Sequence, residues 1–252
     1  MKDSYSSLVP RSNELNNFSY WYPKVVNCGI PMPKSLIFKV PKELEAKFFL
    51  ENDDDYECID KWIKKEIIPV LTKSQMYLLF VKNATFSGKF NAQNCMTSPS
   101  TLTDAITSIN YDALCLGAGG TSEIIVRERI MHNKKKTPCI YNGLPLRSEF
   151  RVFYDFTKKK VIFTENYWRY DYVFPRLYDI TDQIIFEHEK ARLEQEFEKR
   201  KKEVEALVAN AMKDNIFFEG PWSIDIMLEN DTYYLIDMAI AESSAYFENR
   251  PK

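Results

Sequence analysis

The chain has 252 residues, of which 45% are hydrophobic and 14% aromatic, and its formal net charge at pH 7 is −2. This is enough apolar material for a sizeable core in one large domain or in two closely packed lobes. The charge gives no overall basic bias toward nucleic acid, although local basic patches leave nucleic-acid binding open. The N-terminus lacks the apolar core of a signal peptide and no run is long enough to span a bilayer, so we expect a cytoplasmic protein without a membrane partner.

The cysteines are scattered along the chain without any C-x-x-C pair, and only two histidines could join them as ligands of a soft metal. This spacing favours neither a zinc site nor a disulfide framework. We therefore expect reduced, mostly buried thiols at Cys28, Cys58, Cys95, Cys115 and Cys139.

The first predicted elements are two strands with a helix between them. A short apolar strand is expected at residues 35–40, after the proline-punctuated stretch "GIPMP". Apolar residues then recur at helical spacing over residues 59–67, and Pro69 is predicted to end this helix. A second, strongly apolar strand is predicted at residues 76–81.

A lysine follows the second strand directly, and a small turn comes after it. Lys82 at the end of an apolar strand can reach a phosphate as a point charge. The turn holds Ser87, Gly88 and Lys89, where glycine lets backbone amides approach phosphate oxygens. The G-x-x-x-x-G-K-[ST] pattern of a Walker loop is absent, and a solvated hairpin tip is the alternative interpretation.

The middle of the chain combines a glycine-containing turn with a row of charged residues. The turn "LGAGGTSE" at residues 116–123 lacks the G-x-G-x-x-G spacing and precedes a strand predicted at 123–130. Further on, "LPLRSEFRVFYDF" predicts a strand in which Arg147, Glu149 and Arg151 face one side. Such a row suits phosphate or carboxylate, while a solvated ladder of salt bridges is the alternative.

A long helix is predicted over residues 182–215, with an acidic start and a sparse apolar stripe. Its middle, residues 194–202, is densely charged and is expected to be exposed, with Glu198 and Lys202 spaced for an i,i+4 ion pair. A helix whose ends pack and whose middle faces solvent is favoured over a coiled-coil dimer, because too few heptads are apolar.

A β-hairpin with two aspartates follows in "WSIDIMLENDTYYLIDMAIAES", residues 222–243. If its loop has an odd number of residues, as we predict, Asp225 and Asp237 share one face. Like charges in that arrangement repel unless a cation lies between them, and Mg²⁺ would combine such carboxylates with phosphate oxygens. Replacing either aspartate by asparagine is then expected to leave the fold intact. An amphipathic hairpin with solvated acids is the alternative.

The order of these elements resembles the ATP-grasp family, most specifically at "LRSEFRVFYD" and "WSIDIMLENDTYYLIDMA" and less so at "FVKNATFSGKF". The resemblance implies an α+β fold in which two α+β lobes clamp a nucleotide, without an obvious N-terminal Rossmann-like domain. It implies an N-terminal extension at residues 1–28, a first lobe at 29–130, and a second lobe at 131–252 that carries the long helix.

The resemblance also implies roles for individual residues. The expected nucleotide-binding residues are Lys82, Ser87, Gly88, Lys89 and the hinge that meets adenine, Glu128, Arg129 and Ile130. The expected catalytic residues are Arg151, with Arg147 as second candidate, and the Mg²⁺ ligands Asp225 and Asp237. Ala239 stands where the family usually has an asparagine ligand, so Glu242 is the candidate replacement.

The function implied by the resemblance is an ADP-forming ligase that uses ATP and Mg²⁺ to join a carboxylate to an amine through an acylphosphate. The unknown substrates include peptides or proteins. The pattern "RSEFRVF" is also similar to divergent relatives, among them eukaryotic cell-division-cycle proteins that act as assembly chaperones. A degenerate binding module that clamps a protein partner is therefore one alternative, and a kinase or nucleotidyl-transferring enzyme is another.

Overall fold

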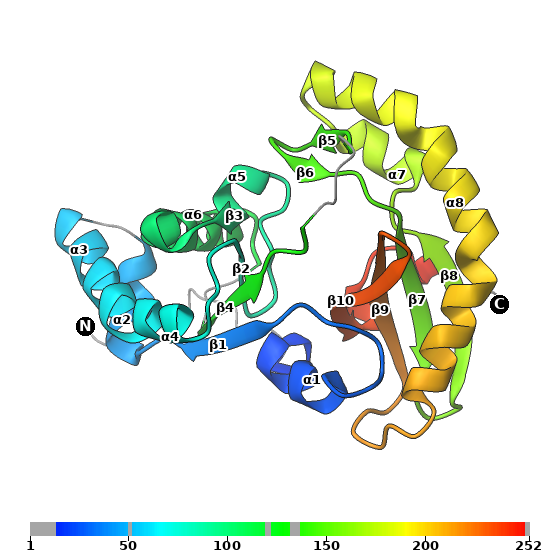
Figure 1. Cartoon of the computed structure of the whole chain (residues 1–252), viewed down its shortest axis with the longest axis horizontal. Coiled ribbons are helices and arrows are strands. Elements are labelled where there is room, and N and C mark those ends of the chain that lie inside the picture. Colours follow the sequence, from blue (N-terminus) through cyan, green and yellow to red (C-terminus); the bar gives the residue numbers. More distant parts are fainter. Residues whose placement is uncertain (1–13, 50–51, 119–121, 132–136, 250–252) are drawn as a thin grey trace. The chain divides into compact units, whose positions relative to one another are not determined.

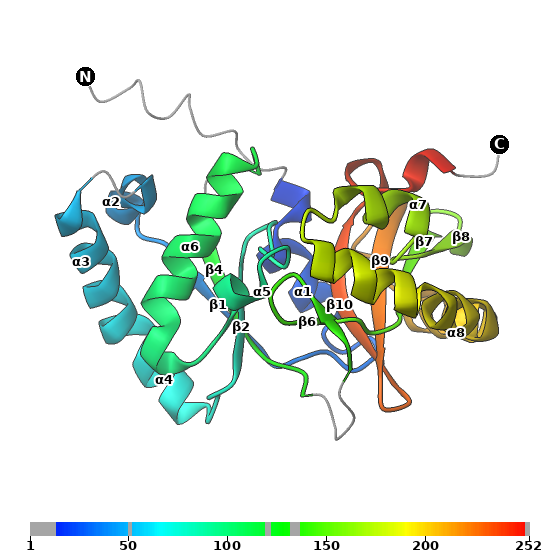
Figure 2. The same cartoon turned by 90° about the horizontal axis from the view of Figure 1, so that it is seen from above.

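The computed structural model describes residues 14–49, 52–118, 122–131 and 137–249, and the chain divides into two compact units. Unit 1 contains the described residues within 1–19, 33–130 and 141–144, and unit 2 contains those within 20–32, 131–140 and 145–252. Each unit combines helices with an antiparallel sheet, which confirms the predicted α+β class (Figures 1 and 2).

Unit 1 is built on a four-stranded antiparallel sheet with the order β1-β4-β2-β3. Its strands are β1 Ser35–Lys39, β2 Leu79–Asn83, β3 Met96–Thr97 and β4 Glu123–Glu128. Its helices are α2 Lys42–Glu45, α3 Asp53–Trp62, α4 Ile68–Lys73, α5 Ala92–Cys95 and α6 Leu102–Cys115. Helix α1, Phe18–Val25, begins in this unit and continues into unit 2. Part of the turn predicted at 116–123, residues 119–121, lies outside the described residues.

The helix predicted over residues 59–67 belongs to a longer helical segment, and the prediction that Pro69 ends it is wrong. The segment begins at α3, where the Asn52 side chain accepts a hydrogen bond from the backbone N–H of Asp55. It continues through the π-helical turn Ile63–Ile67 into α4, where Pro69 stands in the first turn. The π-helical turn before Pro69 accommodates the proline, which has no N–H to donate to the preceding turn.

The two faces of the first sheet differ in polarity. Leu79, Val81, Ile124 and Val126 lie in a hydrophobic core together with residues of the surrounding helices. Since strand residues alternate between faces, the residues in between, among them Lys82, point to the opposite side. That side is the candidate functional face of unit 1.

Cys95 is buried in the core of unit 1, and burial raises the pKa of its thiol to about 12. The other cysteines are half-buried or exposed, so the prediction of mostly buried thiols is wrong, while all five are free.

The raised pKa of Cys95 predicts a pH-dependent loss of stability at high pH. The thiol titrates near pH 8.5 in the unfolded chain, so its stabilising effect is complete below that pH and is lost as pH rises toward 12. We expect the urea midpoint to fall more steeply between pH 8 and 10.5 in the wild type than in Cys95→Ala. Parallel curves for the two proteins would contradict this expectation.

Unit 2 is built on a four-stranded antiparallel sheet with the order β10-β9-β7-β8. Its strands are β7 Glu149–Asp155, β8 Lys160–Asn166, β9 Pro221–Glu229 and β10 Thr232–Ile240. The short strands β5 Cys139–Ile140 and β6 Leu144–Pro145 precede them, and the helices are α7 Tyr170–Val173 and α8 Ile180–Met212.

Helix α8 confirms the long helix predicted at 182–215 and begins two residues earlier, after an N-cap at Asp179. It crosses one face of the sheet (Figure 1). The rings of Phe150 and Phe197 stack there with their centroids 5.7 Å apart. Most residues of its charged middle are exposed, as predicted. The predicted ion pair between Glu198 and Lys202 does not form within the described structure; Arg200 instead pairs with Glu196.

In the hairpin of β9 and β10, a β-bulge rather than an odd-numbered loop places the two aspartates opposite each other. Its turn holds only Asn230 and Asp231, both with positive φ, so the predicted odd loop is wrong. A β-bulge at Ile236 shifts the register by one residue, and Asp237 therefore pairs directly with Asp225. Without the bulge, Ile236 would stand opposite Asp225 and Asp237 would face α8.

Candidate functional site

A row of charged side chains crosses the second sheet on the face away from α8. Glu165 on β8 stands opposite Arg151 on β7, which stands opposite Asp225 on β9, and Asp225 stands opposite Asp237 on β10. Directly paired residues of neighbouring strands project to the same face. The structure therefore brings Arg151, Asp225 and Asp237 together, and it adds Glu165, which the sequence analysis missed.

Arg151 and Asp225 form a bidentate ion pair in the middle of this row. The Nε and Nη2 atoms of Arg151 donate to the two carboxylate oxygens of Asp225 at 2.8 and 2.7 Å. The side chains are only 13% and 8% exposed. Burial disfavours the charged guanidinium, but the nearby carboxylate outweighs it and raises the pKa of Arg151. The charge that offsets Asp225 in this structure is thus an arginine, whereas the sequence analysis expected a cation between the aspartates.

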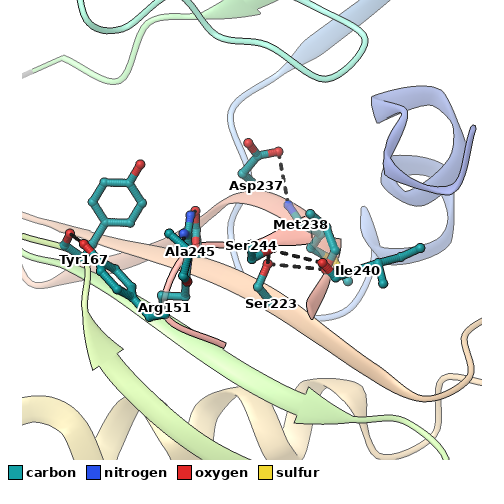
Figure 3. A network of polar contacts seen from close by, with 11 residues as sticks. Arg151, Tyr167, Ser223, Asp237, Met238, Ile240, Ser244 and Ala245 are labelled. Atoms are coloured by element: carbon teal, nitrogen blue, oxygen red, sulfur yellow. Dashed lines mark hydrogen bonds and ion pairs between the residues drawn. The ribbon is translucent and has the colours of Figure 1, made fainter. Parts of the chain in front are cut away.

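The segment after β10 covers Arg151 from the other side. The carbonyl of Ala245 lies 3.5 Å from Nη1 of Arg151, and the guanidinium lies 4.8 Å from the ring centroid of Tyr167 (Figure 3). The Tyr246 hydroxyl donates to the carbonyl of Tyr167 at 2.9 Å, and burial raises the pKa of Tyr246. Tyr167 and Tyr246 come after the ends of β8 and β10, so the alternation of residues in these strands does not predict them as site residues.

Asp237 and Glu242 have different surroundings. Asp237 is half-buried, and its carboxylate accepts a hydrogen bond from the backbone N–H of Met238 at 3.1 Å (Figure 3). Glu242 is exposed and lines a separate cavity of about 400 Å³ with Asp155 and Lys158. Among the described residues, no group of three or more His, Cys, Asp or Glu side chains could hold a metal ion. The structure does not bring Glu242 into a three-carboxylate site with the two aspartates.

Arg147 does not continue the row of Arg151, because β7 begins only at Glu149. Its side chain forms an ion pair with Glu229 at the end of β9, and its carbonyl accepts a hydrogen bond from Nε1 of Trp168 at 2.8 Å. The prediction that Arg147, Glu149 and Arg151 alternate within one strand is therefore wrong for Arg147.

The polar face of the first sheet holds Lys82, which is 2% exposed and lies inside β2 rather than after its end. Its Nζ lies 5.6 Å from the ring centroid of Phe18, and the guanidinium of Arg127 lies 5.3 Å from the same ring. Glu123 accepts a hydrogen bond from the backbone N–H of Ser19 at 3.0 Å. Glu123 and Arg127 were missed as site residues, although their spacing in β4 puts both on the face of Lys82.

The turn after β2 is held by Asn83, whose side chain accepts hydrogen bonds from the backbone N–H groups of Thr85 and Phe86 at 3.2 and 2.8 Å. Gly88 has a φ of +59°, and a Cβ there would lie 3.3 Å from the side chain of Ile109. The local backbone and packing therefore both favour glycine. Ser87 and Lys89 on either side are half-buried, and their contact with phosphate stays a prediction.

The predicted hinge lies at the end of β4, where the chain leaves the main part of unit 1. The backbone N–H of Glu128 donates to Lys34 and that of Arg129 donates to Leu78, at 2.8 and 2.9 Å. The Glu128 side chain is exposed, while Arg129 and Ile130 are half-buried. Adenine binding by these residues stays a prediction.

The fold is of the α+β class and is similar to that of solved structures of Cdc123 and, at lower TM-scores, of ATP-grasp proteins. Among solved structures, Cdc123 from Schizosaccharomyces pombe is similar, with a TM-score of 0.54, 14% identity, and coverage of 92% of this chain and 86% of that one. A RimK domain ATP-grasp protein from Sphaerobacter thermophilus has a TM-score of 0.43 at 10% identity, covering 94% and 62% of the two chains. D-alanine–D-alanine ligase from Bacillus anthracis, crystallised with ATP, has a TM-score of 0.40 at 9% identity and covers 89% and 53%.

No protein-family model and no curated protein matches the sequence. Among the described helices, none combines the length and the apolar character needed to cross a membrane.

Proposed function

We propose that this protein binds Mg-ATP, and that nucleotide-dependent binding of a protein partner is its function. The observation that carries the proposal is the direct pairing of Asp225 with Asp237 beside Arg151. A β-bulge at Ile236 is needed to create this pairing. Bulges of this kind commonly re-aim a side chain at a functional site.

The residues of the row fit a magnesium–phosphate group. Mg²⁺ usually takes one or two carboxylates and completes its octahedron with water and phosphate oxygens. Asp225 and Asp237 would supply the carboxylates, and when bound the ion would neutralise phosphate charge. Each carboxylate oxygen has two lone pairs, so the bonds from Arg151 leave Asp225 able to coordinate. Lys82 is proposed separately as a phosphate ligand, acting as a point charge.

Binding of a partner is favoured over ligation by the state of Arg151. In a ligase, the arginine would hold the acylphosphate formed when the γ-phosphoryl group moves from ATP to a substrate carboxylate, before an amine displaces phosphate. Here the Nε and Nη2 donors of the guanidinium are bonded to Asp225, and the side chain is 13% exposed. The similarity in fold to Cdc123 agrees with the assembly-chaperone alternative raised by "RSEFRVF".

Ligation stays the second candidate, because an arginine and two carboxylates share one row. Incubation with γ-labelled Mg-ATP and a mixed amino-acid and peptide pool separates the possibilities. We expect nucleotide binding with little turnover. Release of ADP and phosphate that depends on an added amine would establish a ligase, and transfer of phosphoryl or AMP to a substrate would establish a kinase or nucleotidyl transferase.

Nucleotide binding itself is tested by the melting temperature. Mg-ATP is expected to raise it, because a ligand that binds only the folded protein stabilises it by mass action. The rise should be much smaller with ATP and excess EDTA. A melting temperature that Mg-ATP leaves unchanged at millimolar concentration would contradict the proposal.

A further inference from the structure

A groove of about 620 Å³ runs along β8, which is an edge strand of the second sheet. It is lined by Phe163, Thr164, Glu165, Asn166, Arg169, Tyr170, Asp171, Glu194, Phe197, Glu198, Lys201 and Asn249. The first four are consecutive in β8. Because successive strand residues point to opposite faces, a groove that touches all of them must follow the outer edge of the strand.

A buried hydroxyl in this groove lacks a hydrogen-bond partner. Thr164 is 3% exposed, and its Oγ1 makes no hydrogen bond in the described part of the chain. Its neighbour Asn166, 4% exposed, is satisfied because its amide donates to Glu194 at 3.0 Å and its oxygen accepts from Trp168. Buried polar atoms are almost always bonded, so the Thr164 hydroxyl indicates a position where a ligand completes the site.

The rim of the groove carries a net negative charge, because Glu165, Asp171, Glu194 and Glu198 outnumber Arg169 and Lys201. Arg169 is already shared between Glu165 and Asp171. Glu194 and Glu198, one turn apart on α8, form no ion pair within the described residues. Like charges at this spacing destabilise a helix, and a cation placed between them would remove that cost.

We propose that this groove binds an extended peptide segment of a partner protein, which adds alongside β8 and places an arginine or lysine between Glu194 and Glu198. The free edge of β8 offers backbone groups for β-strand addition, and side-chain pockets then give specificity. Thr164 would bond a polar group of the segment, and Phe163 and Phe197 would contact its apolar side chains. The site lies wholly in unit 2 and does not depend on nucleotide.

A peptide of defined sequence tests this site. The probe is a fluorescein-labelled octapeptide of alternating valine and threonine with one central arginine, titrated by fluorescence anisotropy without nucleotide. A matched peptide with glutamate at the centre should bind about tenfold or more weakly, because like charges at an interface oppose association. Equal affinity of the two peptides, or no binding of the arginine peptide, would overturn the proposal.

Substitutions of groove residues test whether the peptide binds in the groove. Glu198→Lys is expected to weaken the arginine peptide about tenfold, whereas Glu219→Lys, the same change at an exposed residue outside the groove, should leave affinity unchanged. Thr164→Val removes the unsatisfied hydroxyl, so it should raise the melting temperature while weakening the probe about fivefold.

Two results would count against the site even if the probe binds. An affinity that Glu198→Lys does not change would place the peptide elsewhere. Displacement of the probe by argininamide at the probe's own affinity would show a site for a single cation, and the strand-addition proposal would fail.

Discussion

Replacing Arg151 by methionine is expected to lower the free energy of unfolding by about 3–5 kcal/mol, because it leaves the carboxylate of Asp225 buried without its partner. Both oxygens of Asp225 accept from Arg151, and the two side chains are 13% and 8% exposed. Urea unfolding at constant pH, followed by far-UV circular dichroism, measures the loss. Asp225→Asn should also destabilise the protein, contrary to the expectation drawn from the hairpin sequence alone.

Two further variants show whether the loss comes from the buried pair. Arg169→Met breaks the more exposed pairs with Asp171 and Glu165 and is expected to cost less than about 1 kcal/mol. The double variant Arg151→Met with Asp225→Leu removes both charges and should recover much of the stability lost in Arg151→Met. A single variant as stable as Arg169→Met would show that water offsets the charge of Asp225, and the ion pair would then have little structural role.

Replacing Lys82 by methionine is expected to abolish most of the stabilisation by Mg-ATP, which amounts to about 2.7 kcal/mol at a nucleotide concentration one hundred times Kd. The lysine lies in β2 with 2% of its surface exposed, so its charge is little screened by water. Methionine has a similar length and no charge, so the fold should be kept. Thermal unfolding with and without Mg-ATP measures the effect.

The matched control for Lys82 is Lys65→Met, which removes an exposed lysine from the same unit. It should leave the response to Mg-ATP unchanged. If Lys82→Met responded to nucleotide as the wild type does, Lys82 would be a structural residue, and the proposed role of the first sheet in phosphate binding would fail.

Elements with a strong local period could be predicted from the sequence. Helix α8 follows from the recurrence of apolar residues such as Phe186, Leu193 and Val204, all of which are buried. Strands β9 and β10 follow from alternation on both sides of Asn230 and Asp231. The resemblance in the order of the elements was enough to predict the α+β fold.

Features that depend on register and on distant partners could not be predicted. The bulge at Ile236 is a shift in the register between two strands, and the alternation of apolar and polar residues in the sequence does not reveal it. The bond between Arg151 and Asp225 joins residues 74 positions apart, and it depends on which strands are neighbours in the sheet. The contact of Tyr246 with the site depends on a backbone turn with a φ of +78°, which is uncommon for tyrosine.

The bulge also means that the aspartate pair does not depend on every residue of β10 being kept. Ile236 is one residue more than a regular strand needs between Leu235 and Asp237, so a relative that lacks it and keeps the two-residue turn would still place both acids opposite each other. In an alignment, such a relative would show a one-residue gap at Ile236, and a method that forbids gaps inside strands would misplace the second aspartate.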